Sequence, residues 1–232
     1  MAGTTFAQTG GASETWSWEV VGEMLPRLLE GLWVTLSAVG VGISAALVLG
    51  LVLALLRRSS LRVVSWPVAA FIEFIRSTPL LVQLFFLFFA LPDLGVLLTG
   101  FTAGVIGLGV HYGTYTSESY RAGIENVPEG QWEAAIALNL SRRTTWTSVV
   151  LPQAIPTVIP ALGNYVVAML KDAPLLSTIT VLGVLGVAQQ VNAQTFRPLE
   201  AFTLAGALFL AVSIPASIVV RYLEKRFAYT RT

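Results

Sequence analysis

GLWVTLSAVGVGISAALVLGLVLALL, residues 31–56, is a run of 26 amino acids without one charged side chain. At a helical rise of about 1.5 Å per residue, it is long enough to cross the ~30 Å hydrocarbon core of a bilayer. Of the whole chain of 232 residues, 55% are hydrophobic and only 12% are charged, and the mean hydropathy is +0.73. A soluble domain has roughly 25% charged residues and cannot bury this much apolar surface. The composition therefore predicts an all-α, polytopic membrane protein and disfavours the soluble, disordered and nucleic-acid-binding classes.

The apolar stretches between the charges predict five transmembrane helices. Their expected ranges are 31–56, 66–91, 101–122, 154–172 and 200–222. The stretch 173–196 is uncharged but rich in Gly, Gln and Asn, so we expect a short helix that packs against the bundle near a membrane face. In the third span, Gly109 and Gly113 form a small-xxx-small pair, which permits close helix packing.

The basic residues predict the orientation of these spans. Ten of the 14 Lys and Arg residues lie between spans one and two, between spans three and four, or after span five. The positive-inside rule places them in the cytoplasm, with the N-terminus outside and the C-terminus inside. We therefore expect an extracytoplasmic tail (1–30), a transmembrane domain (31–227) with a cytoplasmic loop at about 125–152, and a cytoplasmic tail (228–232).

The loop between spans three and four predicts a short helix followed by a sharp turn. Pro128 and Glu129 suit the start of a helix, because proline presets φ and an acidic side chain favours the positive end of the helix dipole. Asn139 suits a left-handed residue after that helix, and Ser141 suits the N-cap of a second one. The Ala-rich helix between them fits either a docking site for a partner protein or an ordinary surface helix.

The spacing of this loop resembles the EAA loop of bacterial ABC importer permeases. That pattern reads Glu-Ala-Ala, three residues, Gly, nine residues, Ile, one residue and Leu-Pro. The matching positions here are Glu133, Ala134, Ala135, Asn139, Val149, Leu151 and Pro152. Asn139 replaces Gly and Val149 replaces Ile, and asparagine tolerates the left-handed turn that the glycine serves.

Further segments narrow the resemblance, which covers about residues 30–227. FIRSTPLLVQ, residues 74–83, is similar to the FRGTPLLVQ segment of the polar amino acid branch (His, Glu, Gln, Arg and opine permeases). GQWEAA at 130–135 resembles its GQxEAA segment. The KDAPLL variant at 171–176, together with residues 195–200, looks most like permeases of ectoine or hydroxyectoine importers.

The resemblance implies the type I ABC importer permease fold and a transport function. The chain is then a non-enzymatic permease that moves a small zwitterion, an ectoine or a polar amino acid, across the bacterial plasma membrane. The implied partners are two ATPase copies, a second permease of the same or another sequence, an extracytoplasmic binding protein and lipid. No phosphate-binding loop occurs in the sequence, so ATP and magnesium are expected on the ATPase and no cofactor on this chain. An importer specific for Glu, Gln, Arg or His and an ion-coupled secondary transporter are the alternatives.

The candidate site residues fall into three groups, and none is expected to be catalytic or to bind a metal. The resemblance implies an ATPase-coupling role for Glu129, Gly130, Glu133, Ala134, Ala135, Asn139, Arg142, Arg143, Leu151 and Pro152. Polar residues inside a membrane usually face a cavity or the bundle. On that ground the candidates for the solute path are His111, Thr114, Tyr115, Glu118, Asn164, Lys171 and Asp172. The face of the third span that carries four of them fits either a translocation cavity or a contact with the partner permease. Glu73 and Arg76, three residues apart, are expected to form a structural pair.

Overall fold

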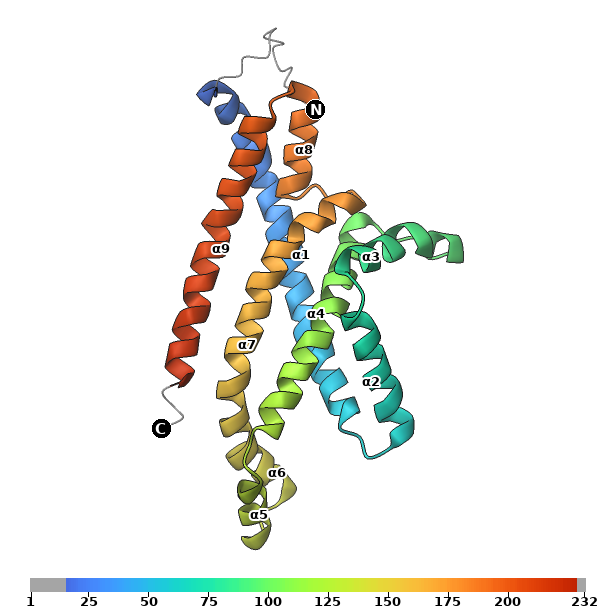
Figure 1. Cartoon of the computed structure of the whole chain (residues 1–232), viewed down its shortest axis with the longest axis vertical. Helices are drawn as coiled ribbons and strands as arrows, with labels where there is room; N and C mark the ends of the chain where they lie inside the picture. Colours follow the sequence, from blue (N-terminus) through green and yellow to red (C-terminus); the bar gives the residue numbers. More distant parts are fainter. Residues whose placement is uncertain (1–15, 229–232) are drawn as a thin grey trace.

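The computed structural model describes residues 16–228, and within that range all regular structure is helical, as predicted. The bundle is elongated, with α1, α4, α7 and α9 along its length, α8 near one end and α5 and α6 at the other (Figure 1). In chain order the elements are α1 (Trp18–Arg57), α2 (Arg62–Arg76), α3 (Leu80–Phe85), a π-helix (Phe86–Ala90), a 3-10 helix (Leu91–Leu94), α4 (Gly100–Glu125), α5 (Glu129–Ala137), α6 (Arg142–Thr144), a π-helix (Thr145–Val150), α7 (Leu151–Asp172), a 3-10 helix (Ala173–Ile179), α8 (Val184–Thr195) and α9 (Pro198–Ala228).

Three or four segments within residues 16–228 qualify as candidate membrane spans, where the sequence predicts five. Within the described residues, three helical stretches are long and apolar enough to cross a membrane: Trp18–Arg57, Arg142–Ile179 and Pro198–Phe227. The bent pair Arg62–Arg76 and Leu80–Leu94 makes a fourth if it counts as one span. The predicted third span does form a helix, α4, but its His, Tyr, Thr and Ser residues lower its hydropathy. Because most of these polar residues are buried in the bundle, α4 has little need of a lipid-facing apolar surface. The count of five is therefore not confirmed.

Glycines bring α1 and α4 into close contact. A Cβ added at Gly109 would lie 3.1 Å from the Cβ of Ala45, and one added at Gly113 would lie 3.0 Å from Leu49 Cδ2. Both distances are shorter than an ordinary contact, so the close packing predicted for this glycine pair is confirmed. The contact between the two helices is closer still at Gly50 of α1, where an added Cβ would lie 1.9 Å from Thr116 Oγ1 of α4.

α1 begins at Trp18, well before the predicted start of the first span at residue 31. The Ser17 side chain caps it by accepting from the Val20 backbone N–H. The Ser17 backbone N–H donates in turn to Glu200 Oε1 of α9 at 3.2 Å, and Glu200 is only 2% exposed. The first and last long helices are thus joined at this end. Residues 1–15 and 229–232 of the two predicted tails lie outside the described residues, and the division of the chain into tails and domain stays a prediction.

The short helix expected within 173–196 is present as α8, which packs against α1 and α9. Its apolar side chains form a cluster with Met24 and Leu28 of α1 and with Ala201 of α9. Thr35 Oγ1 of α1 accepts a hydrogen bond from the Val184 backbone N–H at 3.0 Å, which satisfies a buried donor in the first turn of the helix. The prediction of a packed short helix is therefore confirmed.

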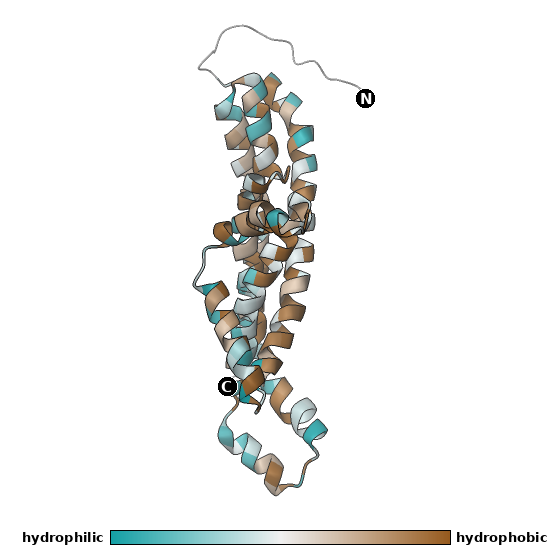
Figure 2. Cartoon of the chain, turned by 90° about the vertical axis from the view of Figure 1, so that its right-hand side faces the viewer, coloured by the Kyte–Doolittle hydropathy of each residue, from teal (hydrophilic) through white to brown (hydrophobic). Residues whose placement is uncertain are grey.

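The largest apolar cluster joins α1, α3, α4, α7 and the 3-10 helix after α7. It lies where these five elements pack against one another. Hydrophobic residues predominate along the length of the molecule (Figure 2). Many large apolar side chains remain exposed, including Trp66 at 71% and Leu210 at 60%. An outward apolar surface of this kind is expected for helices that face lipid or other subunits.

Candidate coupling loop and solute path

The loop after α4 folds as the sequence predicts. α5 begins at Glu129, directly after Pro128, and ends at Ala137. Asn139 has a φ of 51°, which is the left-handed conformation expected of it. Ser141 caps α6, and its side chain accepts from the Thr144 backbone N–H at 3.2 Å. The short helix, the sharp turn and the second N-cap are all confirmed.

A pair of tryptophans holds α5 against the start of the membrane domain. Trp132 of α5 contacts Trp146 edge to face, with ring centroids 5.6 Å apart. Both rings pack on a small apolar cluster that includes Ile124 and Val150. The guanidinium of Arg58, from the turn between α1 and α2, lies 5.9 Å from the Trp146 ring. α5 is therefore packed close to α4, to the start of α7 and to the turn between α1 and α2, so a force on α5 reaches several helices.

The candidate coupling residues lie almost entirely on the surface. Ala135 is buried at 3% exposure, and Asn139 forms the turn. The apolar side chains of Ile136 and Leu138, 75% and 72% exposed, stand beside the acidic Glu133. The exposed members of the predicted set are Glu129, Gly130, Glu133, Ala134, Asn139, Arg142, Arg143, Leu151 and Pro152. Such a projecting surface of mixed apolar and charged side chains is typical of a protein interface.

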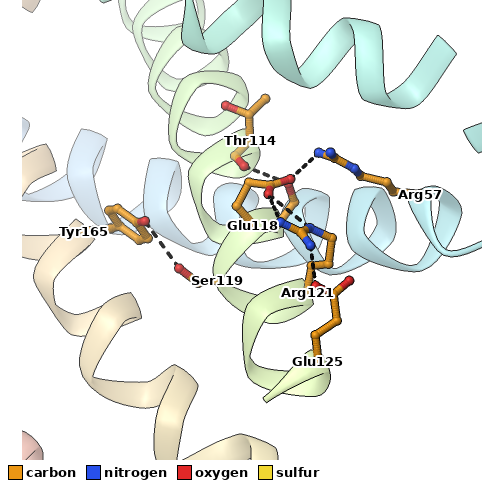
Figure 3. A network of polar contacts seen from close by, with 8 residues as sticks. Arg57, Thr114, Glu118, Ser119, Arg121, Glu125 and Tyr165 are labelled. Atoms are coloured by element: carbon orange, nitrogen blue, oxygen red, sulfur yellow. Dashed lines mark hydrogen bonds and ion pairs between the residues drawn. The ribbon is translucent and has the colours of Figure 1, made fainter. Parts of the chain in front are cut away.

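Glu118 lies at the centre of an ion-pair chain on the α5 side of α4 (Figure 3). Its carboxylate pairs with Arg57 at the end of α1 and with Arg121 Nη2 at 2.8 Å. Arg121 also pairs with Glu125, the last residue of α4. The Glu118 side chain is 18% exposed, so these pairs are partly shielded from water. They fasten α1 to α4 just before the loop that contains α5 and give Glu118 a structural role.

An open depression of about 490 Å³ lies at the break between α2 and α3. It is bounded by this break, by α4 and by the end of α7. The residues that line it are Arg76, Ser77, Thr78, Pro79, Leu80, Leu81, His111, Tyr115, Asp172 and Leu175. Three of the predicted path residues, His111, Tyr115 and Asp172, therefore meet in one place.

The depression carries one positive and one negative side chain, each held by an aromatic residue. The Arg76 guanidinium lies 5.1 Å from the centroid of the Tyr115 ring, a cation–π contact. Asp172 Oδ2 accepts a hydrogen bond from the Tyr112 hydroxyl at 2.7 Å. The depression therefore presents one positive and one negative side chain, each already in contact with an aromatic residue.

The remaining path candidates lie elsewhere. Thr114 is fully buried, and its hydroxyl donates to the His111 carbonyl within α4. Asn164 Nδ2 donates to Glu224 Oε1 of α9 at 3.0 Å. Lys171 is exposed and does not line the depression, although its neighbour Asp172 does. Four of the seven candidates are thus separate from the depression: these three and Glu118.

The predicted pair of Glu73 and Arg76 is not formed within the described residues. Arg76 extends to α4, where it stacks on Tyr115, while Glu73 is exposed and accepts from the Ser77 hydroxyl at 3.5 Å. The aromatic face on α4 offers the guanidinium a better-shielded contact than an exposed carboxylate on its own helix. The correction moves Arg76 from a structural pair to the wall of the depression.

No functional role was predicted from the sequence for two polar residues, Gln83 and Arg57, which the structure places in these contacts. Gln83 binds both the α2–α3 break and His111, and Arg57 binds Glu118. Gln83 is the one polar side chain in the apolar run Leu80–Ala90, and an isolated polar residue in a span is itself a functional signal. Arg57 carried no such signal, because basic residues at a cytoplasmic helix end are expected on topology alone.

Comparison with known proteins supplies further findings. Residues 46–229 match the family described as "Binding-protein-dependent transport system inner membrane component". The chain is 48% identical over 201 residues to a probable amino-acid ABC transporter permease of Sinorhizobium fredii, which covers 87% of each protein. It is 34% identical over 198 residues to a probable glutamine ABC transporter permease of Bacillus subtilis, covering 85% of this chain and 92% of the relative. A crystal structure of an amino acid ABC transporter with histidines matches with a TM-score of 0.86 and 32% identity, over 91% of this chain and 99% of that one.

Proposed function

Because the chain belongs to the family of inner membrane components of binding-protein-dependent transport systems, we propose that it passes a polar amino acid into the cytoplasm as one of two permease subunits. It is the transmembrane permease subunit of an amino acid ABC importer. The observation that carries this function is the match with an amino acid ABC transporter over nearly the full length of both chains. An ectoine is the second candidate solute, on the KDAPLL variant at residues 171–176. The relatives described above are amino acid permeases, which favours the amino acid.

The depression at the α2–α3 break is the proposed solute path. In this proposal Arg76 faces the α-carboxylate of the amino acid and Asp172 faces its α-ammonium group. Tyr112 already holds the Asp172 side chain and Tyr115 already holds the Arg76 side chain. Binding of the solute therefore costs little conformational entropy of these two side chains. The open shape of the depression suits transient contact, because a path must release its solute as readily as it admits it.

α5 is the proposed docking site of the ATPase. It projects from the end of the bundle opposite α8 (Figure 1), with exposed Ile136, Leu138 and Glu133. ATP and Mg²⁺ are bound by that partner, and its movement reaches the membrane domain through the Trp132–Trp146 seat and the Glu118 ion pairs. A full importer in this proposal has two permeases, two ATPase copies and an extracytoplasmic binding protein.

The proposed orientation places α5 and the C-terminus in the cytoplasm. The end of α9, the turn between α1 and α2, and α5 all lie at the same end of the bundle (Figure 1). Within residues 16–228, the basic residues of all three clusters lie toward that end, which agrees with the positive-inside rule for one membrane side. The start of α1 lies at the other end, which is then extracytoplasmic.

Uptake by the reconstituted importer tests the solute. Proteoliposomes that hold the permease with its ATPase, together with the binding protein, are supplied with labelled glutamine, glutamate, arginine, histidine or ectoine. We expect ATP-dependent uptake of at least one amino acid, and a loss of about tenfold or more in Asp172→Asn, which keeps the acceptor for Tyr112 but removes the charge. Uptake of ectoine alone would contradict the amino acid proposal, and unchanged uptake in Asp172→Asn would contradict the path.

A second variant tests the docking site. Glu133→Arg should abolish uptake while the protein still inserts in the membrane, because a reversed charge on α5 opposes docking. The matched control is Glu19→Arg, the same change on an exposed residue in the first turn of α1, at the opposite end of the bundle. Wild-type uptake in Glu133→Arg would contradict a docking role for α5.

A further inference from the structure

The break between α2 and α3 is sharply bent and held by a side chain. The helical segments Arg62–Arg76 and Leu80–Leu94 meet at an angle of 103°. The three residues between α2 and α3 are Ser77, Thr78 and Pro79, and proline prevents α2 from continuing through them. A bend of this kind leaves backbone carbonyls at the end of α2 without their helical partners.

Gln83 supplies donors to these carbonyls from the far side of the break. Its Nε2 donates to the Ile75 carbonyl at 2.8 Å, to the Thr78 carbonyl at 3.1 Å and to Thr78 Oγ1 at 2.8 Å. The Thr78 hydroxyl in turn donates toward the carbonyls of Phe74 and Ile75, both at 3.1 Å. One carboxamide on α3 thus fastens the end of α2 and fixes the angle between the two helices.

The other end of the same carboxamide reaches α4. Gln83 Oε1 lies 3.2 Å from His111 Nδ1, and because a carboxamide oxygen only accepts, Nδ1–H is the donor. This bond fixes the rotation of the imidazole, which lines the depression. One turn further along α4, Tyr115 contacts Arg76 at the end of α2. Each side of the break is therefore tied to α4, and the depression lies between the two ties.

We propose that Gln83 is a positioning residue of transport, which holds the α2–α3 bend and orients His111 so that a solute in the depression alters both together. The proposal rests on the proposed function only in taking the depression as the solute path. A solute that draws the imidazole toward itself lengthens the bond to Gln83 and loosens the carboxamide that holds the break. Occupancy is then converted into a change of angle at a hinge of three residues.

The variant Gln83→Met tests this assignment, because it keeps the length of the side chain and removes every hydrogen bond. Gln190→Met is the matched control, the same change on an exposed residue of α8 far from the break along the chain. Thr78→Val is a second, near-isosteric variant that removes only the hydroxyl which accepts from Gln83. It covers the case in which Gln83→Met does not fold.

The bend is measured directly by spin labels in the assembled importer. The chain contains no cysteine, so Val63→Cys and Leu94→Cys, at residues 88% and 72% exposed, give one label on each side of the break. Each side is about 20 Å long at 1.5 Å per residue, so a change of about 20° in the bend moves the labels by roughly 5 Å. We expect such a shift or a clear broadening in Gln83→Met, a smaller one in Thr78→Val and none in Gln190→Met. An unchanged distance distribution in both Gln83→Met and Thr78→Val would overturn the proposal.

Amino acid uptake separates positioning from general stability. Per assembled importer, Gln83→Met should lower the maximal rate about tenfold, the factor that corresponds to one net hydrogen bond, with an apparent KM within about twofold of the parent. A shifted label distance with unchanged uptake would overturn the link between the bend and transport. If the parent itself moves no amino acid, the proposed function fails, while the label distances still decide whether Gln83 holds the break.

Discussion

Replacing Gly50 with alanine would place a methyl group in the tightest contact between α1 and α4. The added Cβ would lie 1.9 Å from Thr116 Oγ1, 2.8 Å from the Gly113 carbonyl oxygen and 3.0 Å from the Ser117 backbone nitrogen. The Thr116 side chain can rotate away from the methyl group. The two backbone atoms cannot, so α4 itself has to move.

The magnitude follows from the distances. Moving the Gly113 oxygen from 2.8 Å to an ordinary contact of 3.4 Å separates the helices by about 0.6 Å. Rotation of Thr116 also breaks its hydrogen bond to the Ala46 carbonyl of α1, which is 2.9 Å long. Overpacking costs about 1–3 kcal/mol and a lost buried hydrogen bond about 1 kcal/mol, so we expect Gly50→Ala to destabilise the fold by about 3 kcal/mol.

The assay is thermal unfolding of the purified permease in detergent, followed by the fluorescence of its six tryptophans. A loss of this size corresponds to a fall of about 6–12 °C in Tm for a chain of this length. Gly40→Ala is the matched control on the same helix, since an added Cβ there meets nothing within 4 Å. Its Tm should equal or slightly exceed that of the parent, because alanine favours helix. Equal Tm values for Gly50→Ala and Gly40→Ala would refute the close α1–α4 contact.

Three further predictions concern other parts of the molecule. Glu118→Gln should lower stability by about 1 kcal/mol, because the partly shielded ion pairs lose their negative partner. The loss measured by thermal unfolding should be smaller at high salt. A loss that is the same at low and high salt would contradict an ionic origin. Asn139→Gly should leave α5 intact, whereas Asn139→Val should cost about 1–2 kcal/mol, because its φ of 51° excludes a β-branched residue. Amide exchange over residues 129–145 measures this difference, and equal protection in the two variants would count against the turn. Thr35→Val should cost about 1–3 kcal/mol in thermal unfolding, because the buried Val184 N–H loses its acceptor. Ser44→Ala, at an exposed residue of the same helix, should stay within about 0.5 kcal/mol, and an equal loss in both would argue against that bond.

Local signals in the sequence were sufficient for the coupling loop. Proline before a helix, asparagine at a left-handed turn and serine at an N-cap act through the backbone of their immediate neighbours. They therefore located α5, the turn at Asn139 and the start of α6 without knowledge of the bundle. The small-xxx-small spacing of Gly109 and Gly113 located the helix contact, although not the partner helix.

Local signals of this kind could not predict contacts between segments that are distant in the sequence. Glu73 and Arg76 are suitably spaced on one helix, but the ring that attracts Arg76 comes from α4, which no local spacing brings near. Gln83 and His111 are 28 residues apart and meet only because α2 and α3 bend at Pro79. For the same reason the sequence brought together only some of the candidate path residues: His111, Tyr115 and Asp172 line one depression, whereas Asn164 and Glu118 are bound by other helices.

The hydrogen bond from Ser17 to Glu200 can form only late in the biosynthesis of the chain. These residues are 183 positions apart, so at ribosomal rates of about 5–20 residues per second Glu200 is made roughly 10–40 s after Ser17. For most of that interval the start of α1 has neither its carboxylate partner nor the apolar cover of α8, whose residues 184–195 are made only shortly before Glu200. The first helix to be made is consequently among the last to be completed in its contacts. A nascent chain halted before residue 184 would leave that end of α1 without either contact.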